Sequence, residues 1–235
     1  MKILKLSDRL SAVAKYVQTG ASVIDVGTDH GYIPVYLAQN GIARRIVASD
    51  VKQGPLDRAM RSAAEYGVED KIEFVLADGL SGADAYGVDT VIMAGMGGET
   101  IISILSAAKW AHSKDVCLIL QPQSKIAELS GFLHENGFAI LDESLVEDEG
   151  RIYAVMLAQV GEKSEKLTTV EAYAHRRLLD KRDPLLPKYL NELISKTQHA
   201  LEGMEKSARV SATEKAKLES ALDGFIRMRR ETEQW

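Results

Sequence analysis

The chain has 235 residues, of which 46% are hydrophobic and 27% are charged, and its formal net charge is −5. This length and composition are typical of a folded protein with one sizeable core and a smaller appendage. The single cysteine excludes an intrachain disulfide, and the sequence has neither an apolar run near the ~18 residues of a membrane span nor an uncharged leader, so we expect a cytoplasmic protein without membrane contact.

A helix is expected near the amino terminus, over residues 7–17. Apolar residues recur along one side of this stretch at helical spacing, and Ser7 is a suitable cap for its first turn. Lys5, Arg9 and Lys15 fall on the other side. These three cations either form a solvated face or contact phosphate groups, because the helix would lie beside the pocket that the next stretch predicts.

The following stretch carries the clearest functional pattern. Residues 23–26 are predicted to form a buried strand, two glycines then bracket a tight turn, and residues 32–40 continue as a helix. Asp25 and Asp29 flank the turn, and their carboxylates would repel a diphosphate but favour the ammonium and sulfonium groups of S-adenosylmethionine. The expected cofactor contacts in this turn are Asp25, Gly27, Thr28, Asp29 and Gly31.

Three further strands end in polar or glycine-rich loops. Residues 45–50 end in an acid about twenty residues after the first turn, where a carboxylate can accept both ribose hydroxyls of an adenosine. The Asp-Gly pair after residues 72–77 either contacts the adenine amino group or only forms a turn. Residues 89–94 run into a glycine-rich loop, which lets a ligand approach the backbone. The cofactor candidates in these loops are Asp50, Val51, Asp78, Gly79, Ala94 and Gly95.

The remaining part of the first 160 residues completes a sheet. A fifth strand at 116–120 ends in Gln121, and residues 138–146 and 151–160 flank a short acidic turn, which predicts an antiparallel hairpin. The helices expected between the strands span residues 53–66, 101–108 and 124–136. This alternation predicts an α/β fold with a doubly wound sheet of seven strands, whose polar loops gather at the carboxyl ends.

The last third of the sequence is helical and mildly basic, whereas residues 1–160 carry an excess of acidic residues. A polar linker at 161–166 precedes a short helix at 168–181. Two long amphipathic helices, at 184–204 and 212–230, predict an antiparallel hairpin. The cations next to the linker are Arg176, Arg177, Lys181 and Arg182. This part is either a packing or dimerisation arm or a surface for a polyanion, and the sequence leaves the oligomeric state open.

Three motifs and the helical tail together resemble one protein family. The motifs are Val23-Ile24-Asp25-Val26-Gly27-Thr28-Asp29-His30-Gly31-Tyr32-Ile33-Pro34, Ala94-Gly95-Met96-Gly97-Gly98 and Leu120-Gln121-Pro122. They are similar to those of the bacterial tRNA (adenine-22-N1)-methyltransferases. The resemblance implies a Rossmann-like methyltransferase domain over residues 1–160 and a helical coiled-coil hairpin domain over residues 161–235. It also implies methyl transfer from S-adenosylmethionine to N1 of an adenine in the D-arm of tRNA.

The chemistry implied by this resemblance needs positioning more than a strong base. Adenine N1 has an in-plane lone pair, so holding it in line with the sulfonium methyl supplies most of the acceleration. Because N1 lies on the Watson–Crick edge, the base has to leave its stack and enter a pocket. The candidates to line that pocket are Asp29, His30, Tyr32 and Gln121, and the candidates to bind tRNA are Lys5, Arg9, Arg176, Arg177, Lys181 and Arg182. No group of residues has the spacing of metal ligands, so we expect no metal.

Simpler explanations compete with these assignments. Asp29 would instead hold the methionine ammonium, and His30 would satisfy a backbone carbonyl in the turn. Tyr32 would pack on the first helix, and Gln121 would only end its strand. For the whole chain, the alternatives are a methyltransferase for a small molecule or a protein, with the tail as an oligomerisation arm, and an inactive tRNA-binding module. A nicotinamide-dependent dehydrogenase is disfavoured because the G-x-G-x-x-G motif is missing.

Overall fold

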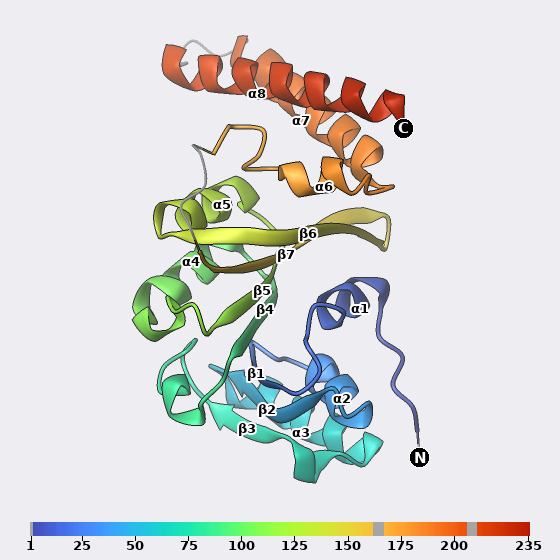
Figure 1. The fold of residues 1–235 in the computed structure, drawn as a ribbon, viewed down its shortest axis with the longest axis vertical. Coiled ribbons are helices and arrows are strands. Elements are labelled where there is room, and N and C mark those ends of the chain that lie inside the picture. Colours follow the sequence, from blue (N-terminus) through green and yellow to red (C-terminus); the bar gives the residue numbers. More distant parts are fainter. Residues whose placement is uncertain (1, 162–166, 206–210) are drawn as a thin grey trace.

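The structure is a computed structural model that describes residues 2–161, 167–205 and 211–235. Seven strands form one sheet in the order β3-β2-β1-β4-β5-β7-β6 (Figure 1). The strands are β1 (Ala21–Val26), β2 (Ala43–Asp50), β3 (Glu73–Leu76), β4 (Thr90–Met96), β5 (Cys117–Pro122), β6 (Phe138–Asp148) and β7 (Arg151–Val160). All seven predicted strands are therefore present.

The strand directions bring the predicted loops to one edge of the sheet. The five strands β1 to β5 run parallel to one another. Strand β7 is antiparallel to both β5 and β6. Because β6 consequently runs in the same direction as β5, the end of β6 lies at the same edge as the ends of β1, β4 and β5. The predicted hairpin is confirmed, and its turn joins the loops at that edge.

Helices cover both faces of the sheet, as a doubly wound fold requires. They are α1 (Asp8–Ala14), α2 (Tyr32–Gln39), α3 (Gln53–Tyr66), α4 (Gly98–Ala107) and α5 (Ile126–Glu135). The core under α1, α2 and α3 includes Val13, Val23, Leu37, Ala63 and Ile119. The core under α4 and α5 includes Ile24, Val91, Leu105, Leu120 and Leu129. Neighbouring residues of β1 enter opposite cores, because side chains alternate along a strand.

The local sequence explains where α1 and α2 begin. Ser7 caps α1, and its hydroxyl accepts a hydrogen bond from the Leu10 amide, as predicted. Gly31 caps α2 with a positive φ of 67°, a conformation that favours glycine. A Cβ at this position would lie 2.8 Å from the Cβ of Ala59 on α3, so a larger residue would push the two helices apart.

The tail contains three helices, α6 (Arg176–Asp180), α7 (Leu186–Glu205) and α8 (Ala212–Glu231). The predicted helix at 168–181 is too long, because residues 169–173 form turns and only α6 is helical. His175 explains the late start, since its extended backbone precedes α6 and its side chain accepts a hydrogen bond from the Arg177 amide. The predicted linker falls mainly on residues 162–166, outside the described residues.

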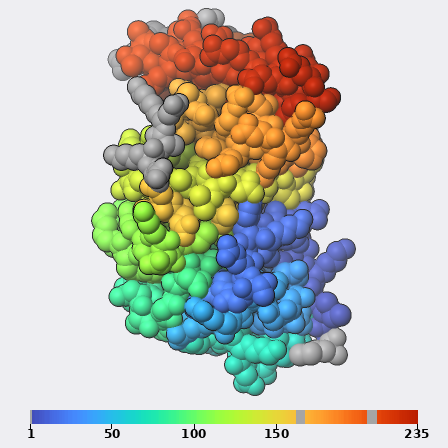
Figure 2. Space-filling model, in the orientation of Figure 1, coloured from blue at the N-terminus to red at the C-terminus, as the bar shows by residue number. Residues whose placement is uncertain are grey.

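The tail packs on the β6–β7 hairpin and forms one end of the molecule (Figures 1 and 2). A third core joins the hairpin to all three tail helices, and its buried members include Leu145, Ala154, Leu178, Leu190 and Phe225. Among the described residues, no helix is long and apolar enough to cross a membrane.

Candidate active site

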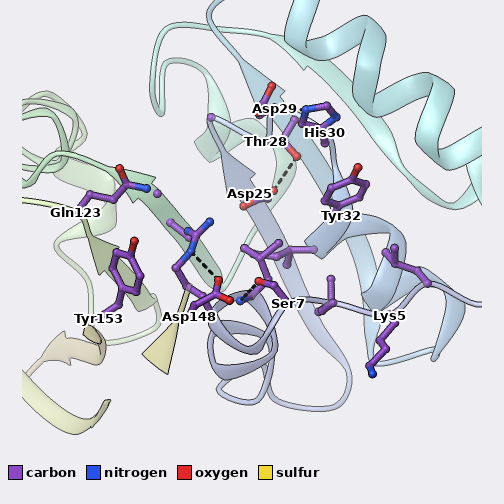
Figure 3. A pocket seen from close by; sticks show the side chains of 18 of the residues that line it. Lys5, Ser7, Asp25, Thr28, Asp29, His30, Tyr32, Gln123, Asp148 and Tyr153 are labelled. Atoms are coloured by element: carbon purple, nitrogen blue, oxygen red, sulfur yellow. Dashed lines mark hydrogen bonds and ion pairs between the residues drawn. The ribbon is translucent and has the colours of Figure 1, made fainter. Parts of the chain in front are cut away.

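A cavity of about 710 Å³ opens at the carboxyl edge of the sheet (Figure 3). Its walls come from the segment leading into α1, the loops after β1, β4 and β5, and the turn between β6 and β7. The predicted site residues that line it are Lys5, Arg9, Asp25, Gly27, Thr28, Asp29, His30, Tyr32, Ala94 and Gly95. Residues that are distant in sequence thus meet in one place, as the strand order predicts.

Asp25 is a buried carboxylate at the centre of the sheet. It lies on β1 between Ala48 of β2 and Ile92 of β4, both fully buried. Burial raises the pKa of Asp25 to about 7, the hydrogen bond from Thr28 opposes this shift, and the charge of Asp50 adds to it. The Thr28 hydroxyl donates to Asp25 Oδ2 at 2.7 Å. Because burial disfavours its ionised form, the Asp25 carboxylate would be stabilised by a cationic partner in the cavity.

Backbone hydrogen bonds hold the turn after β1. The amides of Gly27 and Thr28 both donate to the Ser49 carbonyl, at 2.9 and 3.0 Å, and the amide of Gly31 donates to the Thr28 carbonyl at 2.8 Å. Gly27 has a φ of +70°, and a Cβ there would lie 3.0 Å from Cε of Met96. Glycine is therefore needed at this position both for its backbone angle and for the space beside the cavity.

Asp29, His30 and Tyr32 gather on one side of the cavity (Figure 3). The His30 and Tyr32 rings are stacked, with centroids 5.3 Å apart and planes inclined by 15°. His30 Nε2 lies 3.7 Å from Asp29 Oδ2. Arg58 of α3 donates to Asp29 Oδ1 through Nε, at 3.2 Å, and through a terminal nitrogen. The structure therefore brings the three predicted residues together and adds a cation that the sequence analysis missed.

Gln121 and Arg9 form a connected pair. Gln121 is completely buried at the end of β5 and lies behind the cavity wall instead of lining it. Arg9 Nη1 donates to Gln121 Oε1 at 2.8 Å. A Cβ on Gly95 would lie 3.4 Å from the same Arg9 nitrogen. The group that lies close to the Gly95 backbone is thus Arg9, and the predicted approach of a ligand at this position stays a prediction.

Five of the predicted cofactor residues, Gly31 among them, lie outside the residues that line this cavity. Asp50 ends β2, and its carboxylate accepts hydrogen bonds from the amides of Lys52, at 3.0 Å, and Asp29, at 3.4 Å. Val51 is exposed on the surface. Asp78 and Gly79 line a separate cavity of about 480 Å³ near α4. Asp50 is therefore tied to the β1 turn through Asp29, and the cofactor roles of all five residues stay predictions.

The predicted tRNA contacts divide into paired and unpaired cations. Arg176 lies 3.5 Å from Asp180 and 3.4 Å from Glu231, and Lys181 lies 2.8 Å from Asp142. Arg177 and Arg182 are exposed, and no described residue forms an ion pair with either. Lys5 is exposed at the cavity.

Other lining residues were not singled out by sequence reasoning. Gln123, Asp148, Glu149 and Tyr153 line the cavity from the β5, β6 and β7 side. The position of Asp148 and Glu149 in the hairpin turn, at the carboxyl end of β6, is the sequence feature that could have identified them. Among the described residues, no cluster of three potential metal ligands occurs.

Comparison with known proteins identifies the family. A family model described as a methyltransferase domain matches residues 6–156. The tRNA (adenine(22)-N(1))-methyltransferase of Bacillus subtilis is 31% identical over 230 residues, which are 95% of this chain and 95% of that protein. The chain belongs to the tRNA (adenine-22-N1)-methyltransferase family.

Solved structures extend this methyltransferase likeness to the tail. The crystal structure of the Bacillus subtilis m1A22 tRNA methyltransferase has a TM-score of 0.81 and 28% identity, over 97% of this chain and 99% of that one. A Streptococcus pneumoniae protein crystallised with S-adenosyl-L-methionine has a TM-score of 0.83 and 29% identity, over 96% of this chain and 100% of that one. The similarity therefore covers the helical tail as well as the sheet.

The cavity fits the cofactor of this methyltransferase family, S-adenosylmethionine. The aminoacyl part of this cofactor carries an ammonium, and its sulfur is a sulfonium. Buried Asp25 provides a carboxyl group at the cavity, which a cationic ligand would keep ionised, and the turn at Gly27 lines the same cavity. Acidic groups beside an open backbone suit a cationic ligand and disfavour a diphosphate.

Proposed function

We propose that the protein transfers a methyl group from S-adenosylmethionine to N1 of the adenine at position 22, in the D-arm of tRNA. The observation that carries this proposal is the buried Asp25 in the glycine turn of β1, facing a cavity that is also lined by aromatic and polar side chains. The Bacillus subtilis relative named above supplies the substrate and the position. We place the protein in the cytoplasm, where tRNA is modified.

The turn after β1 holds the aminoacyl part of the cofactor in this proposal. Asp25 and Asp29 offer carboxylates to the ammonium, Gly27 and Thr28 line the cavity around it, and Gly31 closes the turn through its hydrogen bond to the Thr28 carbonyl. Ala94 and Gly95 contribute from the carboxyl end of β4. Asp50 and Val51 would bind the ribose side, and Asp78 and Gly79 would bind the adenine. The cofactor supplies a methyl group on a positively charged sulfur.

The chain itself positions the acceptor base. Adenine N1 attacks with its own lone pair, so the protein needs to orient the base and exclude water rather than remove a proton first. The acceptor has to be extruded from its stack to expose N1. Positive charge develops on the purine during transfer, and in the alternative assignment, in which Asp25 alone holds the ammonium, the Asp29 carboxylate that Arg58 orients would offset it. His30 and Tyr32 offer a stacked aromatic pair beside it.

The tail provides the contact with the tRNA backbone in this proposal. We assign residues 1–160 to the methyltransferase domain and residues 161–235 to a helical hairpin domain that carries exposed cations. Arg177 and Arg182 are the cations least neutralised by described acidic neighbours. The competing assignment makes the tail an oligomerisation arm, and the packing of α7 on α8 is compatible with both.

The direct test is methylation of bulk bacterial tRNA with labelled S-adenosylmethionine, followed by mapping of the labelled nucleoside. We expect 1-methyladenosine at position 22. A transcript of one substrate tRNA with guanine at position 22 is the matched control and should accept no label. Label at another position, or label only in protein or small molecules, would contradict the proposed substrate.

A further inference from the structure

The cavity has a second wall, opposite the β1 turn, that the roles proposed above do not use. Figure 3 shows Gln123 and Tyr153 on one side of the cavity and His30 and Tyr32 on the other. Tyr153 lies on β7, close to the hairpin turn, and Gln123 directly follows β5. If the cofactor occupies the β1 turn, the acceptor base has to approach along the remaining wall.

One side chain, Arg9, connects the parts of this second wall. Its Nη1 donates to Gln121 at 2.8 Å, its Nε lies 3.6 Å from Asp148 Oδ2, and its guanidinium carbon lies 5.6 Å from the centre of the Tyr153 ring. Because Arg9 belongs to α1, these contacts join α1 to the ends of β5 and β6 and to the start of β7. Arg9 therefore lies over the Tyr153 ring while its other contacts are to α1's neighbours at β5 and β6.

Gln121 fixes the orientation of the Arg9 guanidinium. The Gln121 side chain is completely buried and uses both ends of its amide. Its Oε1 accepts from Arg9, and its Nε2 donates to the Pro122 carbonyl at 3.0 Å. Rotating the amide by half a turn would lose both hydrogen bonds and bring an NH₂ group against a cation. Arg9 is thus held in one orientation beside Tyr153.

The surroundings of Arg9 do not suit a phosphate contact. The side chains of Arg9 and Asp148 are only 22% and 20% exposed, and their opposite charges face each other. A phosphate at Arg9 would meet the Asp148 carboxylate as well. Gly95 lets the guanidinium lie against the carboxyl end of β4, where Arg9 forms part of the cavity wall. These features favour a structural role at the cavity over a role in binding the tRNA backbone.

We propose that the acceptor adenine stacks on Tyr153, and that Arg9 is a positioning residue that holds the Tyr153 ring at the cavity wall. This inference rests on the proposed function, because it concerns the base that is methylated. An extruded base is commonly held by stacking on an aromatic side chain. Stacking uses only the face of the purine, so it leaves the N1 edge free to face the β1 side of the cavity.

The first test compares Tyr153→Leu with Tyr153→Phe in the full-length protein. We expect Tyr153→Leu to lower the single-turnover methylation rate at saturating tRNA by about 10- to 100-fold, the range expected for one base–aromatic stack. Tyr153→Phe keeps the ring and should recover most of this loss. Cofactor affinity, measured by calorimetry, should not change in either variant. Tyr86→Leu is the matched control, because Tyr86 also lies under an arginine, Arg45, but outside the cavity.

The second test separates positioning from phosphate binding at Arg9. Arg9→Lys keeps the charge but cannot contact Gln121, Asp148 and the Tyr153 ring in the same way, because an ammonium lacks the planar fork of donors. We expect Arg9→Lys to lower the single-turnover rate at saturation nearly as much as Arg9→Met. The tRNA dissociation constant and its salt dependence should stay unchanged in both. Arg45→Met is the matched control.

Three results would overturn the inference. The first is that Arg9→Lys restores the rate while Arg9→Met weakens tRNA binding and flattens its salt dependence, which would make Arg9 a phosphate contact. The second is that Tyr153→Leu reacts as fast as the wild type. The third is that both residues change only the unfolding temperature. Wild-type protein assayed on the same tRNA keeps this test separate from the proposed function, because a wild type that does not methylate adenine 22 refutes the function itself.

Discussion

Buried carboxylates occur in two regions of the molecule, and their hydrogen-bond partners differ. Asp25 lies in the interior strand β1, accepts a hydrogen bond from the Thr28 hydroxyl and lines the cavity. Glu143 lies on β6 under the tail and accepts the backbone amide of His175 at 2.8 Å. Burial raises the pKa of Asp25 to about 7 and that of Glu143 to about 8. Burial and a raised pKa therefore do not identify a ligand site, whereas a free path to a cavity does.

The carboxylates under the tail join two parts of the chain. Asp183, between α6 and α7, accepts the amide of Leu145 on β6 at 3.1 Å and the amide of Leu185 at 3.0 Å. Glu143 makes the reverse contact: the acid is on β6, and it accepts a hydrogen bond from the backbone amide of His175 in the tail. The strand and the tail thus exchange carboxylate-to-amide hydrogen bonds, so these acids dock the tail on β6, whereas Asp25 lines the cavity.

The largest expected effect comes from removing the docking acid on the tail. Asp183→Ala leaves the buried amide of Leu145 without its partner, and we expect the free energy of unfolding to fall by about 3 kcal/mol, the upper range for a hydrogen bond to a charged group. Chemical denaturation measures this change. Asp180→Ala, in the exposed last turn of α6, is the control and should have little effect. An equal effect in both variants would remove the distinction between docking and surface acids.

The next effect concerns the acid at the cavity. Asp25→Asn removes the charge but keeps the shape, and we expect S-adenosylmethionine to bind more weakly by about 2 kcal/mol. Calorimetry at pH 6 should also show that cofactor binding releases a proton from the wild type and not from the variant, because the ligand cation favours ionised Asp25. Glu143→Gln should leave cofactor affinity unchanged. If both acids affected affinity alike, the comparison would fail.

A smaller effect concerns the pH dependence of stability. The pKa of Glu143 is about 8 in the folded protein, because burial outweighs the amide hydrogen bond and the charge of Lys181, while Asp183 and Asp142 raise it further. Unfolding returns this pKa to its ordinary value, so the folded protein favours protonated Glu143. The resulting contribution to the free energy of unfolding is fully present at low pH and is lost as the pH rises towards 8.

Glu143→Gln provides the measurement. Between pH 6 and pH 7, we expect the wild type to lose about 1.4 kcal/mol more of its free energy of unfolding than this variant, which corresponds to one proton. In both proteins the free energy of unfolding should also decline over this range because of Asp25, whose pKa burial raises to about 7. Parallel pH profiles for the two proteins would show that Glu143 ionises freely.

The smallest effect concerns the exposed cations of the tail. Reversing Arg177 and Arg182 to Glu should reduce the log–log salt dependence of tRNA binding by about 0.7 to 0.9 for each phosphate that the variant no longer neutralises. Reversing Arg176, which already pairs with acidic side chains, should reduce it less. Arg61→Glu, on the exposed side of α3, is the control. An unchanged slope in all variants would favour the tail as an oligomerisation arm.

Much of the fold could be predicted because its determinants are local. All seven strands follow from apolar runs that end in glycine or polar turns, and α3 spans the predicted residues. The β1 turn is equally local, since Asp25, Gly27 and Asp29 lie within five positions of each other. The strand order then gathers their neighbours at one edge. The prediction of a helix over residues 168–181 was wrong, because His175 caps a helix that begins only inside this stretch. The composition of the whole stretch is typical of helices, so it gives no sign of this cap.

The rest of the site depends on contacts that no local pattern encodes. Arg9 and Gln121 are 112 positions apart, and Arg58 and Asp29 are 29 positions apart. In the sequence, Arg9 is only one of several cations on a helix, and Tyr153 is only an aromatic residue within a strand. Their relation to the cavity follows from how α1 and the hairpin pack, which is a property of the whole fold.

The tail also affects how the chain can be synthesised. β6 is an edge strand, paired with β7 on one side, and on its other side the amide of Leu145 is bonded by Asp183. A ribosome produces β6 and β7 before it produces the tail, so the nascent chain exposes an unpaired strand edge for a time. Such edges recruit other strands and promote aggregation. The interval between β7 and α7 is therefore the stage of synthesis at which this protein most needs a chaperone or rapid translation.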